Sequence, residues 1–284
     1  MTAEGTTLAG VSALAGVVVP AHDESALIGM VLDALTSTVP PGTFDVVVVC
    51  NGCSDDTAEI ARRVPGVRVV ELARPSKSHA LSVGAALLPR GPRVQLDADV
   101  MIDGRDVLAL VTSLGDGIEA VAPERRLPLA HSSWPVRAYY RVWTRLPQVR
   151  DGLFGRGVIV LSVAGQARVD ALPPVLSDDL AISECFAPGE RRVVGRATAT
   201  VRPPRRLADL VRRRARVVAG NRQADALRLR GRSASTGLGT LVRLALADPR
   251  TALAMPVFAG VTIAARRLGT TEDGWLRDES SRAA

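Results

Sequence analysis

The sequence predicts an α/β fold, in which a mostly parallel central sheet is flanked by helices and followed by a C-terminal helical extension. Short apolar runs with no polar face, such as residues 45–50 (DVVVVC), are typical of strands buried on both sides of a parallel sheet. Such runs alternate with segments of helical periodicity over the first hundred residues. This β–α repetition indicates a sheet that helices cover on both faces.

The first predicted strand is residues 16–20 (GVVVP), an apolar run that ends at a proline. Asp23 to Ser25 then supply capping oxygens and negative charge for a helix N-terminus. Residues 27–35 place Leu, Ile and Val on one face of that helix. The predicted elements that follow are a strand at 45–50, a helix from Asp55, a strand at 67–71, a helix at 78–88 and a strand at 93–96.

The second half of the chain is less regular. Residues 132–146 are predicted to be helical and carry all but one of the Trp and Tyr residues, a pattern that fits core packing or an acceptor-binding wall. A glycine turn at 155–157 leads into a strand that ends at Ser162. Residues 177–180 (SDDL) open another helix, and a strand at 192–201 and an arginine-rich helix at 207–229 follow.

Residues 231–237 (GRSASTG) are the predicted linker, because they combine glycine and serine between two helical segments. The linker divides the chain into a domain at 1–232 and a C-terminal helical extension and tail at 233–284. The chain is apolar enough to bury a sizeable core, since 47% of its 284 residues are hydrophobic, and because only 3% are aromatic this core must consist mainly of Val, Leu, Ala and Ile.

From about residue 239 the chain is apolar and helical, and Thr251 to Ala265 carry no charge. This run is too short to span a bilayer comfortably. Arginines flank it at both ends, as they do in interfacial helices whose long basic side chains reach the headgroups. Two arrangements therefore fit residues 239–267: peripheral contact with a membrane, or packing against the domain.

The net charge of +7 is carried almost wholly by arginine, because Lys77 is the only lysine. It favours an anionic partner, such as a phosphate or an acidic lipid surface. No aromatic residues interleave the arginines at 202–222, which disfavours nucleic acid as a partner.

The three cysteines, Cys50, Cys53 and Cys185, form no even disulfide framework. The C-x-x-C spacing of the first two lacks the second pair that a zinc site needs, so reduced thiols of a cytosolic protein fit better. No basic segment precedes the first apolar run, and no signal peptide is therefore expected.

Two carboxylates, Asp97 and Asp99, directly follow the strand predicted at 93–96. Ligands of parallel sheets bind beyond the carboxyl ends of the strands, where these residues would lie. Carboxylate oxygens suit Mg²⁺ or Mn²⁺, which also accept phosphate oxygens as ligands. Taken alone, the pair also fits an ordinary polar turn.

Four segments in order resemble the motifs of family-2 glycosyltransferases. They are residues 17–24 (VVVPAHDE), 51–57 (NGCSDDT), 77–84 (KSHALSVG) and 95–99 (QLDAD), which together cover roughly residues 16–100. The resemblance implies the GT-A fold of nucleotide-diphospho-sugar transferases. It also implies that Mg²⁺ or Mn²⁺ binds at Asp97 and Asp99 together with the diphosphate of a nucleotide-sugar donor.

The resemblance further implies which residues line the donor site and which supplies the base. Residues 177–180 match the family's Glu-Asp segment, so Asp179 is the expected general base, although Asp178 fits within a one-residue ambiguity. Asn51 stands where the family usually has the aspartate that contacts the base of the nucleotide. No Gln-x-x-Arg-Trp motif is present, which argues against a processive synthase. The implied nucleotide-binding residues are Pro20, Ala21, Asp23, Glu24, Asn51, Lys77, Asp97, Arg213 and Arg216.

The predicted function is a metal-dependent, inverting transfer of one sugar to an acceptor hydroxyl. The acceptor is a small molecule, a glycan or a lipid carrier, and the protein is expected in the cytoplasm, with the inner membrane face as its site if residues 239–267 touch lipid. A polyprenyl-phosphate sugar transferase is the first alternative, because a phosphate acceptor needs no base. A non-catalytic, membrane-associated module that binds nucleotide sugar is the second.

Overall fold

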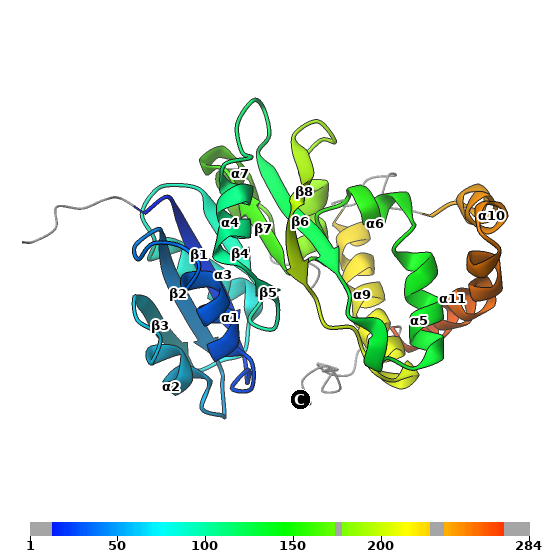
Figure 1. Ribbon diagram of the computed structural model, residues 1–284, viewed down its shortest axis with the longest axis horizontal. Helices are drawn as coiled ribbons and strands as arrows, with labels where there is room; N and C mark the ends of the chain where they lie inside the picture. Colours follow the sequence, from blue (N-terminus) through cyan, green and yellow to red (C-terminus); the bar gives the residue numbers. More distant parts are fainter. Residues whose placement is uncertain (1–12, 174–177, 228–235, 270–284) are drawn as a thin grey trace, which may run out of the picture.

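The computed structural model describes residues 13–173, 178–227 and 236–269. Within them, eight strands form one sheet in the order β3-β2-β1-β4-β7-β6-β8-β5 (Figure 1). The strands are β1 (Ala15–Ala21), β2 (Phe44–Asn51), β3 (Val67–Leu72), β4 (Arg93–Leu96), β5 (Met101–Ile102), β6 (Ala120–Arg126), β7 (Val158–Leu161) and β8 (Arg191–Thr200).

Helices flank the sheet and build a separate layer beside it, which Figure 1 shows to the right of β6 and β8. The strands and helices predicted for the first hundred residues are present, with ends within a few residues of the expected ones. The helices are α1 (Ile28–Thr36), α2 (Thr57–Arg62), α3 (Lys77–Ala86), α4 (Gly104–Val111), α5 (Trp134–Trp143), α6 (Pro147–Asp151), α7 (Val163–Asp170), α8 (Asp178–Glu184), α9 (Leu207–Ala226), α10 (Leu238–Ala247) and α11 (Pro249–Leu268), with a 3-10 turn η1 (Leu129–His131).

The sheet is parallel in its first half and mixed in its second. Strands β1, β2, β3 and β4 pair only in parallel with one another. Strand β7 runs antiparallel to both β4 and β6, whereas β8 is parallel to β6 and antiparallel to β5. In this register Leu96 pairs with Val158, so the chain entering β7 lies beside the chain leaving β4. This reversal brings the 155–157 turn to the carboxyl edge of the parallel strands.

Both faces of the first strands are buried, as their lack of a polar face predicts. Val17 and Val19 of β1 are fully buried in the core cluster that contains Ile28 and Leu32 of α1. Val18 points the other way and packs with Ala80 of α3. Because each fully buried valine contributes about 1.5–3 kcal/mol, these strands anchor the fold strongly.

The aromatic helix α5 is part of a second core rather than an open wall. Tyr139 is 1% exposed, and its ring stacks on Phe258 of α11 with 5.2 Å between ring centroids. Leu210 of α9 and Val261 of α11 are buried in the same cluster. One face of the C-terminal helices therefore packs against α5 and α9, which is one of the two arrangements that the sequence left open.

Helix α1 begins at Ile28 with no side-chain cap, so the prediction that Asp23 to Ser25 cap it is wrong. The oxygen of Asp23 instead accepts the N–H of Ser54 at 2.6 Å, because the loop after β2 presents its own backbone donors there. Part of the predicted linker, residues 231–235, lies outside the described residues, and the boundary between 232 and 233 stays a prediction.

Candidate functional site

A small pocket lies beyond the carboxyl ends of β1 and β4. Four residues from separate segments line it: Pro20 of β1, Lys77 at the start of α3, Asp97 after β4 and Asp179 at the start of α8. All four were predicted as site residues from the sequence. The remaining lining residues are Leu81, Gln95, Leu96, Leu153, Gly157, Val158 and Ile159.

Asp97 presents a solvent-accessible carboxylate to this pocket. The Nζ of Lys77 lies 2.8 Å from its Oδ1, and the two side chains are 41% and 38% exposed. An ion pair this open to water is worth at most about 1 kcal/mol, so a bound ligand can rearrange it at little cost. The carbonyl oxygen of Asp97 accepts the N–H of Val100, which closes a turn that contains the half-buried Asp99. Asp99 is not among the residues that line the pocket.

Asp179 is held by backbone donors at the beginning of α8. Its Oδ2 accepts the N–H of Gly155 at 2.6 Å, and its Oδ1 accepts the N–H of Leu180 at 2.9 Å. These two hydrogen bonds fix the orientation of the carboxylate. Asp178 is the first residue of α8, but its side chain lies outside the described part of the chain.

One short loop connects the two acidic residues. Gly155 donates to Asp179, and the carbonyl oxygen of Gly157 accepts the N–H of Asp97 at 2.8 Å. Both glycines have positive φ, and a Cβ on Gly157 would lie 2.3 Å from Cγ2 of Val100. Only glycine fits these positions without strain. The sequence predicted a turn here but not its contact with either carboxylate, since both contacts are long-range.

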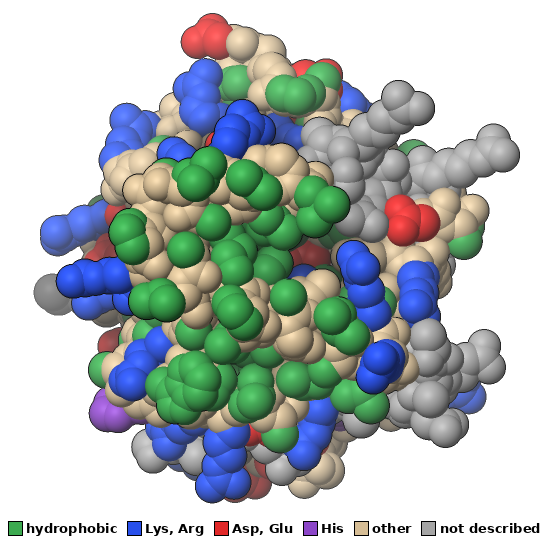
Figure 2. All heavy atoms as spheres, turned by 90° about the vertical axis from the view of Figure 1, so that its right-hand side faces the viewer, with side chains coloured by type: hydrophobic (Ala, Val, Ile, Leu, Met, Phe, Trp, Pro, Cys, Tyr) green, Lys and Arg blue, Asp and Glu red, His purple; other side chains and the backbone are tan. Residues whose placement is uncertain are grey.

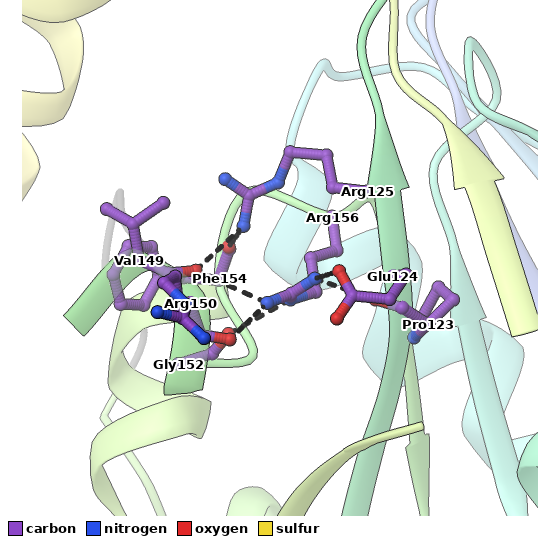
Figure 3. A network of polar contacts seen from close by, with 8 residues as sticks. All are labelled: Pro123, Glu124, Arg125, Val149, Arg150, Gly152, Phe154 and Arg156. Atoms are coloured by element: carbon purple, nitrogen blue, oxygen red, sulfur yellow. Dashed lines mark hydrogen bonds and ion pairs between the residues drawn. The ribbon is translucent and has the colours of Figure 1, made fainter. Parts of the chain in front are cut away.

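A buried arginine fixes the shape of this loop, as Figure 3 shows. The Arg156 side chain is 2% exposed, and its Nη1 lies 3.5 Å from the carboxylate of Glu124. The guanidinium offers five N–H donors in a rigid plane, which suits a ring of carbonyl acceptors. It donates to the backbone oxygens of Pro123, Val149, Arg150 and Gly152.

A second arginine, Arg125 of β6, lies beside Arg156 and contacts the same loop (Figure 3). Its Nη2 donates to the carbonyl oxygens of Val149 and Phe154, and its guanidinium lies 4.5 Å from the centre of the Trp143 ring. Burial, reinforced by the positive charge of Arg156, lowers the pKa of Arg125 to about 9. Neither arginine was predicted as a functional residue, because an isolated arginine in a strand or a turn gives no periodic signal.

Four other predicted nucleotide-binding residues, Ala21, Asp23, Glu24 and Asn51, lie at or just after the ends of β1 and β2, outside the lining of this pocket. Asn51 is 2% exposed, and its Nδ2 donates to the carbonyl oxygen of Ala21 at 2.8 Å. Its Oδ1 accepts the N–H of Ser76, the residue that caps the helix carrying Lys77. Glu24, 7% exposed, donates its N–H to Thr57. These contacts tie three strand-end loops together.

Reduced cysteines lie next to this cluster. Cys53 Sγ accepts the N–H of Asp23 at 3.4 Å. A hydrogen bond from Cys50 lowers the pKa of Cys53 to about 7 and raises the pKa of Cys50. Within the described residues, His22, Asp23 and Cys53 bring one ligand atom each to within 4.8 Å of one another.

The two α9 arginines do not reach the small pocket. Arg213 donates to the carbonyl oxygen of Arg202 at 3.1 Å, and Arg216 is exposed on the same helix. Neither lines the pocket in the described residues. Their predicted contact with the donor diphosphate therefore stays a prediction.

The architecture is that of the GT-A class of sugar-nucleotide transferases. It is shared with the mannosyltransferase PcManGT from Pyrobaculum calidifontis, solved in complex with GDP-Man and Mn²⁺, with a TM-score of 0.65 and 21% identity over 92% of this chain and 88% of that one. Residues 13–154 match the family described as Glycosyltransferase like family 2. The chain belongs to this family, which confirms the resemblance seen in its motifs.

Curated proteins with similar sequences are found in mycobacteria. An uncharacterized glycosyltransferase of Mycobacterium tuberculosis and its counterpart in Mycobacterium bovis are each 35% identical over 104 residues, which is 37% of this chain and 46% of the relative. The chain thus spans about half the length of the curated relatives it matches. Glucosyl-3-phosphoglycerate synthase from M. tuberculosis is a more distant structural neighbour, with 23% identity and a TM-score of 0.49 over 66% of this chain and 71% of that one.

Proposed function

We propose that the protein transfers a single sugar from a nucleoside-diphosphate donor to an acceptor hydroxyl, with inversion at the anomeric carbon. One observation carries this proposal: Lys77, Asp97 and Asp179, from three separate segments, line one pocket at the carboxyl edge of the sheet. Family membership supports the reaction class. In this pocket Lys77 would supply a positive charge for the phosphates. Asp97 would supply a carboxylate for the metal ion, and Asp179 a carboxylate for proton transfer.

On the donor side, Asp97 and Asp99 would hold Mg²⁺ or Mn²⁺. The residues fit such an ion, because they are hard oxygen donors and the Asp97 carboxylate is accessible from the pocket. When bound, the ion neutralises the charge of the leaving nucleoside diphosphate. Lys77, already beside Asp97, would place a second positive charge at the phosphates. The Mn²⁺ and GDP-Man of the Pyrobaculum enzyme support this assignment by analogy of fold.

On the acceptor side, Asp179 would remove the proton from the attacking hydroxyl. Its two backbone hydrogen bonds fix the carboxylate in one orientation while it lines the pocket. Arg125 lies close enough to attract the Asp179 carboxylate electrostatically. Asp178 remains the alternative base, since the sequence motif allows either residue.

A second function, sugar transfer to a polyprenyl phosphate, is favoured by the exposed leucines of α10 and α11. The acceptor phosphate would already be ionised and would need no general base. Transfer that survives both Asp179→Asn and Asp178→Asn would support this alternative over hydroxyl glycosylation.

A thermal-shift panel of GDP, UDP, ADP and CDP, each with and without Mn²⁺, tests the donor site. A ligand that binds only the folded state at 100 times its Kd stabilises it by about 2.7 kcal/mol, so one nucleotide should raise Tm clearly and Mn²⁺ should enhance the shift. The Asp97→Asn variant should lose the Mn²⁺-dependent part. Asp170→Asn, an exposed aspartate on α7, is the matched control and should keep it.

Two outcomes would count against the proposal. If no nucleotide shifted Tm, the proposed donor site would be excluded. If the Mn²⁺ effect were unchanged in Asp97→Asn, the proposed role of Asp97 in metal binding would be excluded. Nucleotide binding without sugar transfer or donor hydrolysis would instead identify a non-catalytic binding module.

A further inference from the structure

Helices α10 and α11 carry large apolar side chains on their outer side. Leu238 and Leu246 of α10 are each 82% exposed, and Leu253 of α11 is 81% exposed. Surface helices normally turn their apolar stripe to the core and a polar stripe to water. We call this surface the outer apolar face, and its large members are Leu238, Val242, Leu246, Leu253, Ile263 and Leu268.

Helix α11 is apolar on both of its sides. Its inner side packs Thr251, Ala254, Val261 and Ala265 against the domain, where all four are buried. The most apolar stretch of 18 residues in α11 has a mean hydropathy of 1.2, and only 22% of that stretch is buried in the structure. The inner packing accounts for one side of the helix and leaves the apolar composition of the outer side unexplained.

The charges that α10 and α11 themselves carry are nearly all positive. Residues 236–269 contain four arginines and one acid, Asp248, a balance of +4 − 1 = +3. The carboxylate of Asp248 caps α11 and pairs with Arg145, so it is engaged on the domain. Figure 2, which faces this side of the molecule, shows a broad apolar area bordered mostly by basic side chains, with a few acidic ones at the top and right. The four arginines are Arg243, Arg250, Arg266 and Arg267.

We propose that the outer apolar face docks the protein on an anionic lipid bilayer, with α10 and α11 lying in the interface. The leucines would enter the boundary between headgroups and acyl chains, and the arginines would reach the lipid phosphates. A second copy of the chain is a poorer occupant, because a two-fold contact would place one set of arginines against the other. This partner goes beyond the proposed sugar transfer and does not depend on it.

Co-sedimentation of the full chain with vesicles tests the proposal. Binding should be strong to vesicles that contain phosphatidylglycerol, weak to pure phosphatidylcholine, and weaker as salt screens the arginines. Leu246→Glu with Leu253→Glu should lower the partition coefficient more than about tenfold for each leucine. Arg266→Gln with Arg267→Gln should lower binding to anionic vesicles about fivefold for each arginine and leave binding to neutral vesicles unchanged.

Met30→Glu is the matched control, because Met30 is 49% exposed on α1, at the other end of the molecule in Figure 1. It should bind vesicles like the wild type, and thermal unfolding should show that every variant is folded. The proposal would be overturned if the wild-type protein did not bind vesicles. It would also be overturned if the double leucine variant bound them as well as the wild type does. So would a stable dimer in solution that the leucine substitutions abolish, since the face would then join two copies.

The nucleotide-dependent Tm shift separates this proposal from the catalytic one. The leucine and arginine variants should keep that shift, because their side chains lie on the helical layer and not in the pocket. Loss of vesicle binding with a retained shift would confirm two independent sites.

Discussion

Asp97 and Asp179 come from different segments of the chain, and one loop contacts both of them. Asp97 is held through its backbone N–H by Gly157, and Asp179 through its carboxylate by Gly155. The backbone of a three-residue turn therefore helps to fix the separation between Asp97, the proposed metal ligand, and Asp179, the proposed base. Groups that are positioned before substrate binds need no reorganisation during the reaction.

The Asp179→Asn substitution should lower kcat about 10²–10⁴-fold, because the amide keeps the shape of the carboxylate but cannot accept the proton. Its effect on the donor-dependent Tm shift should be small, since the amide oxygen can still accept the N–H of Gly155. Sugar transfer measured with saturating donor provides the check, and Asp170→Asn serves again as the control. A kcat within threefold of the wild type would exclude Asp179 as the base.

Cys53 should react with iodoacetamide with a midpoint near pH 7, because the hydrogen bond from Cys50 stabilises its thiolate. Its folded pKa lies below the ordinary thiol value, so it stabilises the fold above that ordinary value and loses this contribution as pH falls through 7. Burial raises the pKa of Cys185, which should therefore react only at higher pH.

Mass spectrometry of each cysteine peptide across pH 5–10 measures this difference. The Cys50→Ala variant removes the hydrogen bond and should move the midpoint of Cys53 upward. Identical pH profiles for Cys53 and Cys185 in the wild type would contradict the assignment.

At the scale of elements, the segment from α6 to β7 is held by side chains rather than by a regular ladder. Helix α6 is only five residues long, and the carbonyl groups at the end of a helix lack intrahelical partners. Arg156 and Arg125 supply donors to these groups and to the turn that follows. The loop that bridges the two acidic residues thus depends on buried guanidinium groups.

The Arg156→Leu substitution should destabilise the fold by about 3–5 kcal/mol, since it removes the Arg156 donor from the carbonyl oxygens of Pro123, Arg150 and Gly152. Urea unfolding monitored by circular dichroism measures the loss. Arg150→Leu is the matched control, because that side chain is exposed on the same segment and should change stability by less than about 0.5 kcal/mol. Equal effects of the two substitutions would show that the buried network contributes nothing special.

At the scale of the whole molecule, the candidate site and the proposed lipid-binding face lie in different layers. The candidate site sits at the carboxyl edge of the sheet, and the outer apolar face belongs to α10 and α11 (Figure 1). The two layers meet through α5, whose aromatic residues pack against α9 and α11. A protein that binds lipid through its helices would therefore keep its site on a rigidly attached domain, and the vesicle experiment probes this arrangement directly.

The local pattern predicted most of what lies before residue 100. Strands such as β2 can be recognised in the sequence as continuous apolar runs, because a strand that is buried on both faces has few positions for polar residues. Pro20, Lys77, Asp97 and Asp179 were predicted as site residues, and the fold does bring them to one pocket. The helix cap predicted at Asp23 is not formed, because the backbone N–H of Ser54 in the loop after β2 competes with the helix for the Asp23 carboxylate and donates to it.

The sequence by itself determined the fold class, the family and the candidate chemistry, because apolar periodicity and short motifs are local properties of the chain. Only the tertiary structure decided that β7 runs antiparallel to β4, that Gly155 and Gly157 link the two acidic residues, and that Arg156 supports their loop. It also decided that α11 packs one side and exposes the other. Each of these depends on contacts between residues far apart in the chain, whose energies arise only once the layers have assembled.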